Sequence, residues 1–429
     1  MEKVLIITYY WPPAGGPGVQ RWLKFVKYLR DFGIEPVVYI PENPNYPMRD
    51  KSFETEIPEG ITILKKTIFE PYQIAGIFAK NQTKTISKGI IAAEENQSLL
   101  QKFLLFIRGN LFIPDARKFW IKPSVKFLKT YLEEEGIKKI ITTGPPHSLH
   151  LIGLELKKEL DLKWIADFRD PWTQIGYHKK LKLTKKNDQK HKDLECEVLN
   201  SADQIITTSF TTKAEFSEKT SKPISVITNG FDVEKNKIQS TELNTEFSIS
   251  HIGSLLSERN PENLWRAIAE LANENSGFSK DLELKLAGTV SEEVITSIKS
   301  AGLGEKLQLL GYVNHKEAIN VQQKSRLLLL IEINSKETRG IIPGKLFEYL
   351  MAKRPILAIG PKKWDVQQIL EETGSGEYFQ YSEKDRLKSL ILAHYEVYKK
   401  GKSGFVTGNI QQYHRKNLTQ KLANLIKSV

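Results

Sequence analysis

The chain has 429 residues, more than one compact core usually holds, so at least two domains are expected. With 40% hydrophobic and 27% charged residues, its composition excludes an intrinsically disordered protein. A single cysteine, Cys196, excludes a disulfide framework and a multi-cysteine metal cluster, and it fits a reducing compartment. No apolar run reaches the roughly 20 residues of a spanning helix, and the first run is too short for a signal peptide. We therefore expect a cytoplasmic protein.

The positive charge is unevenly distributed along the chain. The net charge is +12, and residues 80–195 supply +9 of it, with 23 Lys/Arg against 14 Asp/Glu. Within this region, LLQKFLLFIRGNLFIPDARKFWIKPSVKFLK (99–129) interleaves aliphatic and aromatic residues with cations. Such a stretch fits an anionic membrane surface or nucleic acid, and scattered charge is most often just a solvated face. Because apolar residues accompany the cations and no nucleic-acid motif is present, we favour peripheral binding to the inner face of the plasma membrane over nucleic acid.

In chain order, short β-branched runs alternate with helix-like stretches, which is typical of βαβ units and parallel sheets. In the first half the runs are KVLIITYY, PVVYI, ITILKK, KKIITTG, KWIADF, DQIITTS and ISVITNG. In the second half they are FSISHIGS, LELKLAG, KLQLLGYV, RLLLLIEI and RPILAIG. The clearest helix is GVQRWLKFVKYLRDFG, where an apolar stripe leaves out Arg21, Lys24 and Arg30, and Gly33 supplies the stop.

A polar stretch without a strand pattern, residues 229–247, separates the two halves. We therefore predict an α/β fold class of two Rossmann-like, doubly wound domains that face each other across a cleft. The expected boundaries are 1–235 and 236–405, followed by a terminal helix in 406–429 that packs back on the first domain. Sheets of this kind bind ligands at the carboxyl ends of their strands, so the loops there hold the candidate residues.

Two glycine-containing loops follow strands of the first half. In YYWPPAGGPG, Gly15, Gly16 and Gly18 would let a ligand approach the backbone closely. Their spacing is not the dinucleotide fingerprint, and a plain proline–glycine turn is an equal alternative. In TTGPPHSLH, His147 could shuttle a proton or contact an acceptor, although a loop histidine is more often structural.

A third loop, WIADFRDPW, concentrates charge at a strand end. Alternation places Asp167 and Arg169 on the same side of the strand, with Asp170 next to them. These groups could face a polar acceptor or a developing positive charge on a sugar. The competing interpretation is an internal ion pair that fixes the loop.

Two loops of the second half combine glycine with cations. In HIGSLLSERNPENL, Gly253 ends a strand, and Arg259 precedes a helix that begins near a proline, an arrangement that suits a diphosphate. In GIIPGKLFEYLMAKRPILAIG, Gly344 starts a helix whose first turn carries Lys345, with Glu348 one turn later on the same face. An exposed salt bridge between these two would contribute only about 0.3–0.5 kcal/mol, so two separate ligand contacts explain them better.

Five motifs in this order, YYWPPAGG, ADFRDPW, NGFD, HIGSLLSERNPENL and PGKLFEYLMAKRPILAIG, resemble the GT-B glycosyltransferases of glycosyltransferase family 4 over nearly the whole chain. The resemblance implies transfer of a sugar from a nucleoside diphosphate sugar, with retention at the anomeric carbon and without a metal ion or other cofactor. It implies that the second domain holds the nucleotide sugar, with a UDP-sugar as the expected donor, and that the first domain holds the acceptor.

The resemblance also implies roles for individual residues. Glu348 matches the glutamate that binds the donor ribose hydroxyls, and an acceptor-only carboxylate suits a vicinal diol. Arg259 matches the basic residue that pairs with the diphosphate, and Gly253 the glycine at that strand end. Gly15 and Gly16 match the glycine loop over the donor phosphates, and Arg169 falls near a histidine of many relatives.

Two positions depart from the family pattern. Gly340 stands where relatives carry a further glutamate, and Glu337 is out of register with it. Ser254 replaces the usual arginine after the glycine, which leaves Arg259 and Lys345 to bind the diphosphate. The resulting hypothesis is a hexosyl- or N-acetylhexosaminyl-transferase of cell-surface polysaccharide biosynthesis that acts on a glycan or lipid-linked acceptor. The alternatives are a sugar-nucleotide 2-epimerase and a non-catalytic nucleotide-sugar-binding module.

Overall fold

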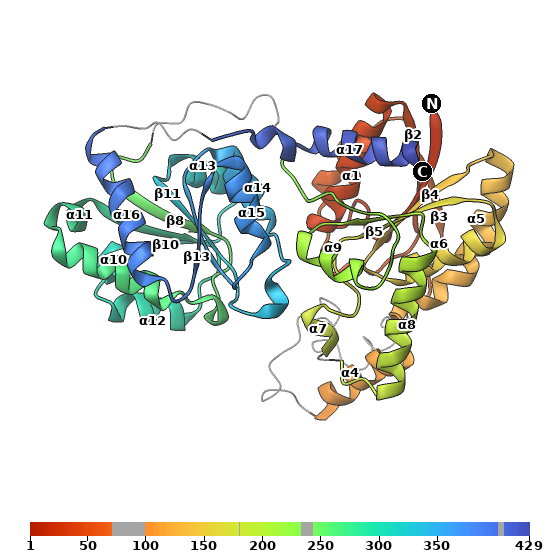
Figure 1. Ribbon diagram of the computed structural model, residues 1–429, viewed down its shortest axis with the longest axis horizontal. Coiled ribbons are helices and arrows are strands. Elements are labelled where there is room, and N and C mark those ends of the chain that lie inside the picture. The colour runs from red at the N-terminus through yellow and green to blue at the C-terminus, as the bar shows by residue number, and fades with distance from the viewer. Residues whose placement is uncertain (71–98, 180, 233–242, 402–406) are drawn as a thin grey trace. The chain divides into compact units, whose positions relative to one another are not determined.

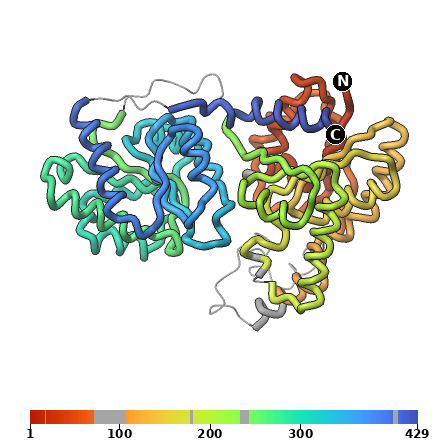
Figure 2. The backbone as a smooth tube through the Cα atoms, viewed as in Figure 1, coloured from red at the N-terminus to blue at the C-terminus, as the bar shows by residue number. Residues whose placement is uncertain are grey.

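The computed structural model describes residues 1–70, 99–179, 181–232, 243–401 and 407–429. By internal contacts the chain divides into two compact units (Figure 1). Unit 1 comprises Met1–Thr228 and Arg415–Val429, and unit 2 comprises Asn229–His414. Both ends of the chain thus belong to unit 1 (Figure 2).

Unit 1 contains a seven-stranded parallel sheet in the order β3-β2-β1-β4-β5-β6-β7. Its strands are β1 (Glu2–Ile7), β2 (Ile34–Pro41), β3 (Thr62–Lys66), β4 (Lys139–Gly144), β5 (Lys163–Phe168), β6 (Gln204–Thr207) and β7 (Ile224–Val226). Its helices are α1 (Pro17–Leu29), α4 (Leu99–Leu111), α5 (Ile121–Glu135), α6 (Ser148–Glu159), α7 (Gly176–Lys179), α8 (Lys185–Ser201), α9 (Phe210–Ser217) and α17 (Arg415–Ser428).

Both faces of the unit 1 sheet are buried, which is why its strands read as continuous apolar runs. In β1, Leu5 and Ile7 face one core while Val4 and Ile6 face the other. The second of these cores also contains residues of α1 and α17, which lie side by side in Figure 1. α17 therefore contributes directly to the core of a unit whose other residues come from the first 228 positions.

Unit 2 contains a six-stranded parallel sheet in the order β10-β9-β8-β11-β12-β13. Its strands are β8 (Phe247–Ile252), β9 (Leu282–Ala287), β10 (Leu307–Gly311), β11 (Leu327–Ile331), β12 (Ile356–Gly360) and β13 (Gly376–Gln380). Its helices are α10 (Glu262–Glu274), α11 (Ser276–Asp281), α12 (Glu292–Ser300), α13 (His315–Lys324), α14 (Gly344–Ala352), α15 (Asp365–Thr373) and α16 (Lys384–Lys399). Ile249 of β8 lies opposite Leu284 of β9 and Leu327 of β11, in the middle of the core.

The predicted fold class of two doubly wound, Rossmann-like units is confirmed, and each of the twelve predicted apolar runs contains a strand. The thirteenth strand, β13 (GEYFQ), was not predicted. It is an edge strand with mostly partly exposed side chains, so it lacks the apolar run that marks the others.

Candidate functional site

Unit 2 offers a ligand site where its strand order reverses. β8 and β11 are neighbours in the sheet, but the strands that follow them in sequence lie on opposite sides, β9 beyond β8 and β12 beyond β11. The loops after β8 and β11 therefore diverge, and doubly wound sheets hold their ligands at such points. The predicted residues Gly253, Ser254 and Arg259 lie on the loop after β8, and α14 follows the loop after β11.

Lys345 lies directly against the backbone of Gly253. Gly253 has φ +126°, which favours glycine, and a Cβ atom placed there would lie 1.7 Å from Lys345 Nζ. Gly288, after β9, also packs against this backbone, because its Cβ would lie 2.7 Å from the carbonyl carbon of Gly253. Only glycine at position 253 therefore allows the Lys345 ammonium group to reach the end of β8.

Tyr349 fixes the position of α14 on the sheet. Its hydroxyl accepts the N–H of Ile252 at 3.1 Å and donates to the carbonyl of Leu329 at 3.3 Å, which ties the helix to β8 and β11. The helix begins at Gly344 with Pro343 as its N-cap, and no side chain caps its first turn. Free first-turn N–H groups and the helix dipole both favour an anion at this end.

A buried carboxylate, Glu332, holds Arg259 beside this helix end. The guanidinium donates to Glu332 Oε1 from Nη2 at 2.9 Å and from Nε at 3.2 Å. Glu332 is the first residue after β11, is only 2% exposed, and also accepts the N–H of Ile333 at 2.8 Å. Sequence reasoning missed this residue, although a carboxylate that closes the apolar run RLLLLIEI was a usable signal.

Lys345 has no hydrogen bond or ion pair with any residue that the structure describes, and this includes Glu348. Burial lowers the pKa of Lys345, and the Arg259 guanidinium lowers it further, against an opposing effect of Glu348 and Glu332. The folded protein thus holds an ammonium group in surroundings that disfavour its charge. An anion bound there would relieve this cost.

Glu348 lies one helical turn beyond Lys345 and keeps part of its hydrogen-bonding capacity. Its Oε2 accepts the side-chain amide of buried Gln322 at 2.9 Å, and the residue is partly exposed. Ser254, on the loop after β8, and Gly344, at the start of α14, are both exposed, and Gly340 is partly exposed after the short helical turn Lys336–Thr338. A partly exposed carboxylate next to a cation can accept hydrogen bonds from a diol while the cation binds phosphate.

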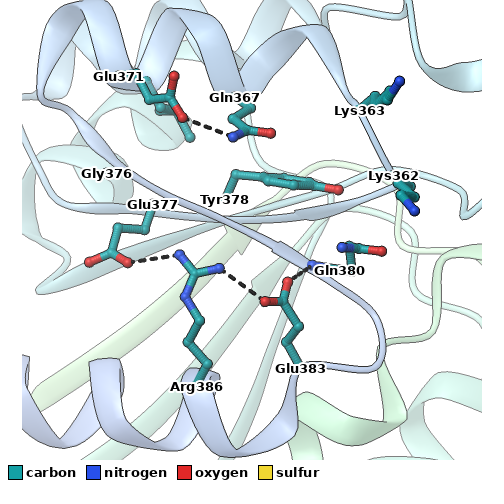
Figure 3. A pocket seen from close by; sticks show the side chains of 11 residues that line it. Lys362, Lys363, Gln367, Glu371, Gly376, Glu377, Tyr378, Gln380, Glu383 and Arg386 are labelled. Atoms are coloured by element: carbon teal, nitrogen blue, oxygen red, sulfur yellow. Dashed lines mark hydrogen bonds and ion pairs between the residues drawn. The ribbon is translucent and has the colours of Figure 1, made fainter.

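A separate cavity of about 360 Å³ lies against the edge strand β13, between α15 and α16 (Figure 3). Within its lining, Arg386 pairs with Glu377 at 3.2 Å and with Glu383 at 3.0 Å. Its lining shares no residue with the Lys345 cluster. We therefore assign it no part in the candidate site.

In unit 1, Asp167 is an internal residue with a complete set of partners. It is 0% exposed and accepts from Arg21 Nη2 at 2.8 Å, Trp22 Nε1 at 2.8 Å and Thr143 Oγ1 at 2.9 Å. Arg21 is itself buried, although the sequence pattern placed it outside the apolar stripe of α1. The ion pair fixes the first turns of α1 to the end of β5, and Asp167 makes no hydrogen bond with Arg169 among the described residues.

Arg169 instead crosses the start of α1. Its Nη2 donates to the carbonyl of Pro145 and its Nε to that of Gly144 at 3.3 Å, and the guanidinium lies 5.5 Å from the centre of the Tyr10 ring. A Cβ at Gly18 would lie 2.0 Å from Arg169 Nη1, so this glycine of the predicted loop makes room for the cation. Burial raises the pKa of the neighbouring Asp170 carboxyl, and the Arg169 charge opposes this.

The other glycines of this loop lie at the start of α1. Gly16 is the N-cap of the helix with φ +99°, and no side chain caps the first turn. Gly15 donates its N–H to the carbonyl of Met48 at 3.0 Å, and the side chain of Met48 covers both glycines. Unit 1 thus carries its own uncapped helix start next to Arg169.

His147 is a buried histidine with both ring nitrogens unpartnered among the described residues. It stacks on Trp172 at 4.9 Å between ring centres, and it is 4% exposed. Burial lowers the pKa of His147 to about 3, so the ring is neutral near pH 7. A neutral imidazole can accept or donate one hydrogen bond, and the charge of Arg169, on the loop after β5, acts on the ring.

The buried histidines predict an acid-sensitive fold. Burial lowers the pKa of His147 to about 3, of His191 to about 4 and of His251 to about 3, against about 6.5 in the unfolded chain. Between these values the unfolded state binds more protons, so stability is full above about pH 6.5 and falls as the pH decreases. Each histidine contributes about 1.4 kcal/mol per pH unit in this window.

We therefore expect the thermal unfolding midpoint to fall steadily from pH 7 to pH 4. Differential scanning fluorimetry at constant ionic strength measures this. His251→Asn should reduce the slope, because it removes one of these buried histidines. A midpoint that is flat between pH 7 and pH 5 would contradict the expectation.

Comparison with solved structures places the fold. No protein-family model matches this sequence, and no curated protein sequence matches it either. The lipopolysaccharide outer core galactosyltransferase WaaB is similar with a TM-score of 0.60 and 13% identity, over 100% of this chain and 99% of WaaB. Staphylococcus aureus TarM, solved with UDP, has a TM-score of 0.57 and 12% identity, over 99% of this chain and 100% of TarM.

The same two-unit fold also occurs in another class of enzyme. The UDP-GlcNAc 2-epimerase of Methanocaldococcus jannaschii has a TM-score of 0.51 and 11% identity, with 100% of each chain covered. At these identities the likeness establishes the GT-B type of fold and leaves the reaction open.

Two further features of the described residues concern side-chain groups that could hold a metal ion and helices that could span a membrane. Among the described residues, no group of three or more His, Cys, Asp and Glu side chains is arranged to hold a metal ion. None of the helices in the described part of the chain combines the length and the apolar character needed to cross a bilayer.

Proposed function

We propose that the chain is a retaining, metal-independent glycosyltransferase that moves a sugar from a nucleoside diphosphate sugar to a glycan or lipid-linked acceptor. The observation that carries the proposal is the Lys345 ammonium group at the end of β8, which is partly buried and unpaired among the described residues. It lies at an uncapped helix start, in electrostatic reach of Arg259. Two cations and a helix N-terminus suit a diphosphate and supply the positive charge that a metal ion provides elsewhere.

In this proposal unit 2 binds the nucleotide sugar. Lys345 and Arg259 stabilise the negative charge that grows on the departing diphosphate, and Gly253, Ser254 and Gly344 keep the backbone accessible to it. Glu348 accepts hydrogen bonds from the ribose hydroxyls. Glu332 holds Arg259 in place, since it already binds the guanidinium at 2.9 Å.

Unit 1 binds the acceptor in this proposal. His147, Arg169 and Asp170 contact the acceptor or the reacting sugar, and Asp167 acts through Arg21 as a positioning residue because it is fully buried. The bond between the anomeric carbon and the phosphate oxygen breaks, and the acceptor oxygen bonds to the same face of that carbon. The leaving phosphate oxygen takes the acceptor proton, so no protein base is required.

The donor base, sugar and pathway extend the proposal further. The expected donor is a UDP-sugar, supported by the UDP bound in TarM, and the expected group is a hexosyl or N-acetylhexosaminyl unit. We place this activity in cell-surface polysaccharide biosynthesis at the cytoplasmic face of the membrane, and the pathway is supported by WaaB, a lipopolysaccharide outer core galactosyltransferase. A thermal-shift series with UDP, GDP and dTDP tests the first point, because a ligand of the native state raises the unfolding midpoint.

The principal alternative is a 2-epimerase, favoured by the same fold in the M. jannaschii enzyme. Incubation with the donor alone separates the two: an epimerase produces an epimeric nucleotide sugar, whereas a transferase releases UDP slowly by hydrolysis and faster with acceptor. A non-catalytic binding module would give a thermal shift with UDP but neither product.

Glu348 provides a specific test of the ribose contact. We expect Glu348→Gln to lower UDP affinity about 10- to 100-fold, the usual range for a hydrogen bond to a charged group. The wild-type protein should prefer UDP over 2′-deoxy-UDP, and the variant should lose this preference. Isothermal titration of both nucleotides into both proteins measures the coupling. An unchanged preference in the variant would exclude Glu348 as the ribose ligand.

A further inference from the structure

An exposed aromatic patch lies on unit 1 and is formed by residues that the candidate site does not include. Of the six large hydrophobic side chains exposed in the described part of unit 1, four lie on or beside α4 and the turn after it: Phe69 (54%), Phe106 (43%), Leu111 (59%) and Phe119 (44%). Phe119 contacts Phe69 with 5.6 Å between ring centres and Phe112 with 6.2 Å. We call Phe69, Leu111, Phe112 and Phe119 the aromatic patch.

A lysine lies in the middle of the aromatic patch. Lys118 Nζ is 5.6 Å from the Phe112 ring centre and 5.3 Å from that of Phe119, and it donates to the Leu111 carbonyl at 2.5 Å. The Phe112 and Phe119 rings thus both lie next to the ammonium group of Lys118. Exposed apolar groups that cluster in this way mark an interaction surface more often than a solvated face.

Exposed lysines border the aromatic patch on more than one side. Lys65 and Lys66 end β3, and the Lys66 carbonyl accepts the Trp120 indole N–H at 3.3 Å, next to Phe119. On α8, the Asn187 side chain donates to the Asn110 carbonyl at 3.2 Å, which brings the start of that helix beside Leu111. The exposed lysines at the end of β3, at the start of α8 and in the first two turns of α5, which follows Trp120 directly, are Lys65, Lys66, Lys122, Lys126, Lys185 and Lys186. We call these six residues the lysine rim. None of these six forms an ion pair with a described residue.

Two of the three nearby carboxylates are already engaged within the protein. Glu70 is 1% exposed and bound to Tyr9 at 2.8 Å and to Arg117 at 3.0 Å. Asp115 accepts the Ser148 hydroxyl at 2.6 Å. The third, Glu42, is exposed, and it accepts the hydroxyl of Thr67, the residue after Lys66, at 2.8 Å.

We propose that unit 1 docks on an anionic lipid bilayer through the aromatic patch and its lysine rim. Aromatic and aliphatic side chains enter the interfacial layer, while lysines around them bind lipid phosphates. Nucleic acid fits less well, because an exposed leucine and phenylalanine cluster offers no base-edge hydrogen bonds. This inference does not rest on the proposed sugar transfer. It replaces the stretch 99–129 as the membrane-binding surface, because Leu105, Trp120, Val125 and Leu128 of that stretch are buried.

Vesicle co-sedimentation tests the proposal with the full chain. Wild-type protein should bind phosphatidylglycerol/phosphatidylcholine vesicles at low salt and be released at high salt, and it should not bind pure phosphatidylcholine. Lys65→Ala/Lys66→Ala should lower the partition coefficient about 25-fold, or about fivefold per lysine. Leu111→Ser/Phe119→Ser should abolish binding without lowering the unfolding midpoint, since both side chains are exposed.

Matched controls come from unit 2. Lys362→Ala/Lys363→Ala removes the same charge from adjacent exposed lysines, and Leu309→Ser removes a leucine that is 49% exposed. Both controls should bind vesicles as the wild type does. Absence of wild-type binding, or an equal loss in the controls, would overturn the proposal. Competition by polyuridylate combined with full binding by Leu111→Ser/Phe119→Ser would indicate a nucleic-acid surface instead.

Discussion

Lys345→Ala should lower the affinity for UDP about 100-fold and leave the free protein folded, with an unchanged or slightly higher unfolding midpoint. The loss reflects a charge-assisted contact to phosphate in a partly buried place, typically about 1.5–3 kcal/mol. The stability follows from the lowered pKa of Lys345: because the folded surroundings disfavour its charge, removing that charge costs nothing. Isothermal titration with UDP and a thermal scan of the free protein measure the two effects.

Gly253→Ala and Lys362→Ala complete this experiment. The alanine methyl group would overlap Lys345 Nζ, 1.7 Å away, so Gly253→Ala should also weaken UDP binding while Lys345 is still present. Lys362, an exposed lysine of the same unit, controls for the loss of net charge. Unchanged UDP affinity in Lys345→Ala would remove the basis for the phosphate site. A UDP loss equal to that of Lys345→Ala in the control would point to long-range electrostatics.

The second large effect is expected at the Arg21–Asp167 pair. Asp167→Ala should destabilise unit 1 by about 3–5 kcal/mol, because it leaves the Arg21 guanidinium buried and without its carboxylate. Urea unfolding measures the change, and hydrogen exchange in α1 and β5 assigns it to unit 1.

Replacing both partners distinguishes a structural role from a catalytic one. Arg21→Met/Asp167→Leu removes both charges together and should recover most of the stability. If Asp167 acts only by positioning α1, the double variant should also recover UDP release from the donor. A stable Asp167→Ala protein, with a loss below about 1 kcal/mol, would contradict the internal role.

The sequence predicts the architecture well because burial leaves a direct trace in it. Both sheets are parallel and covered on both faces, so most of their strands are continuous apolar runs. The edge strand β13 is more polar and lacks such a run. The candidate residues of unit 2 could also be identified from the sequence, since Gly253, Lys345 and Glu348 lie at strand ends and helix starts that the sequence pattern defines.

The ion pairs at the site could not be predicted from the sequence, because they join residues far apart in the chain. Arg21 and Asp167 are 146 positions apart, and Arg259 and Glu332 are 73 apart. Periodicity alone places a charged residue such as Arg21 on the solvent side of its helix. It is buried because its guanidinium binds Asp167 and the Thr228 carbonyl, and no local pattern reports those partners.

The return of α17 to unit 1 has a consequence for the order in which the protein can fold during synthesis. All of Asn229–His414 is synthesised before α17, and Phe231 donates its N–H to the Tyr413 carbonyl at 3.1 Å, so the two ends of that segment meet. Every residue of unit 2 has therefore been synthesised while one core of unit 1 still lacks Leu418, Leu422 and Ile426. The unit that starts first at the ribosome is the one that finishes last.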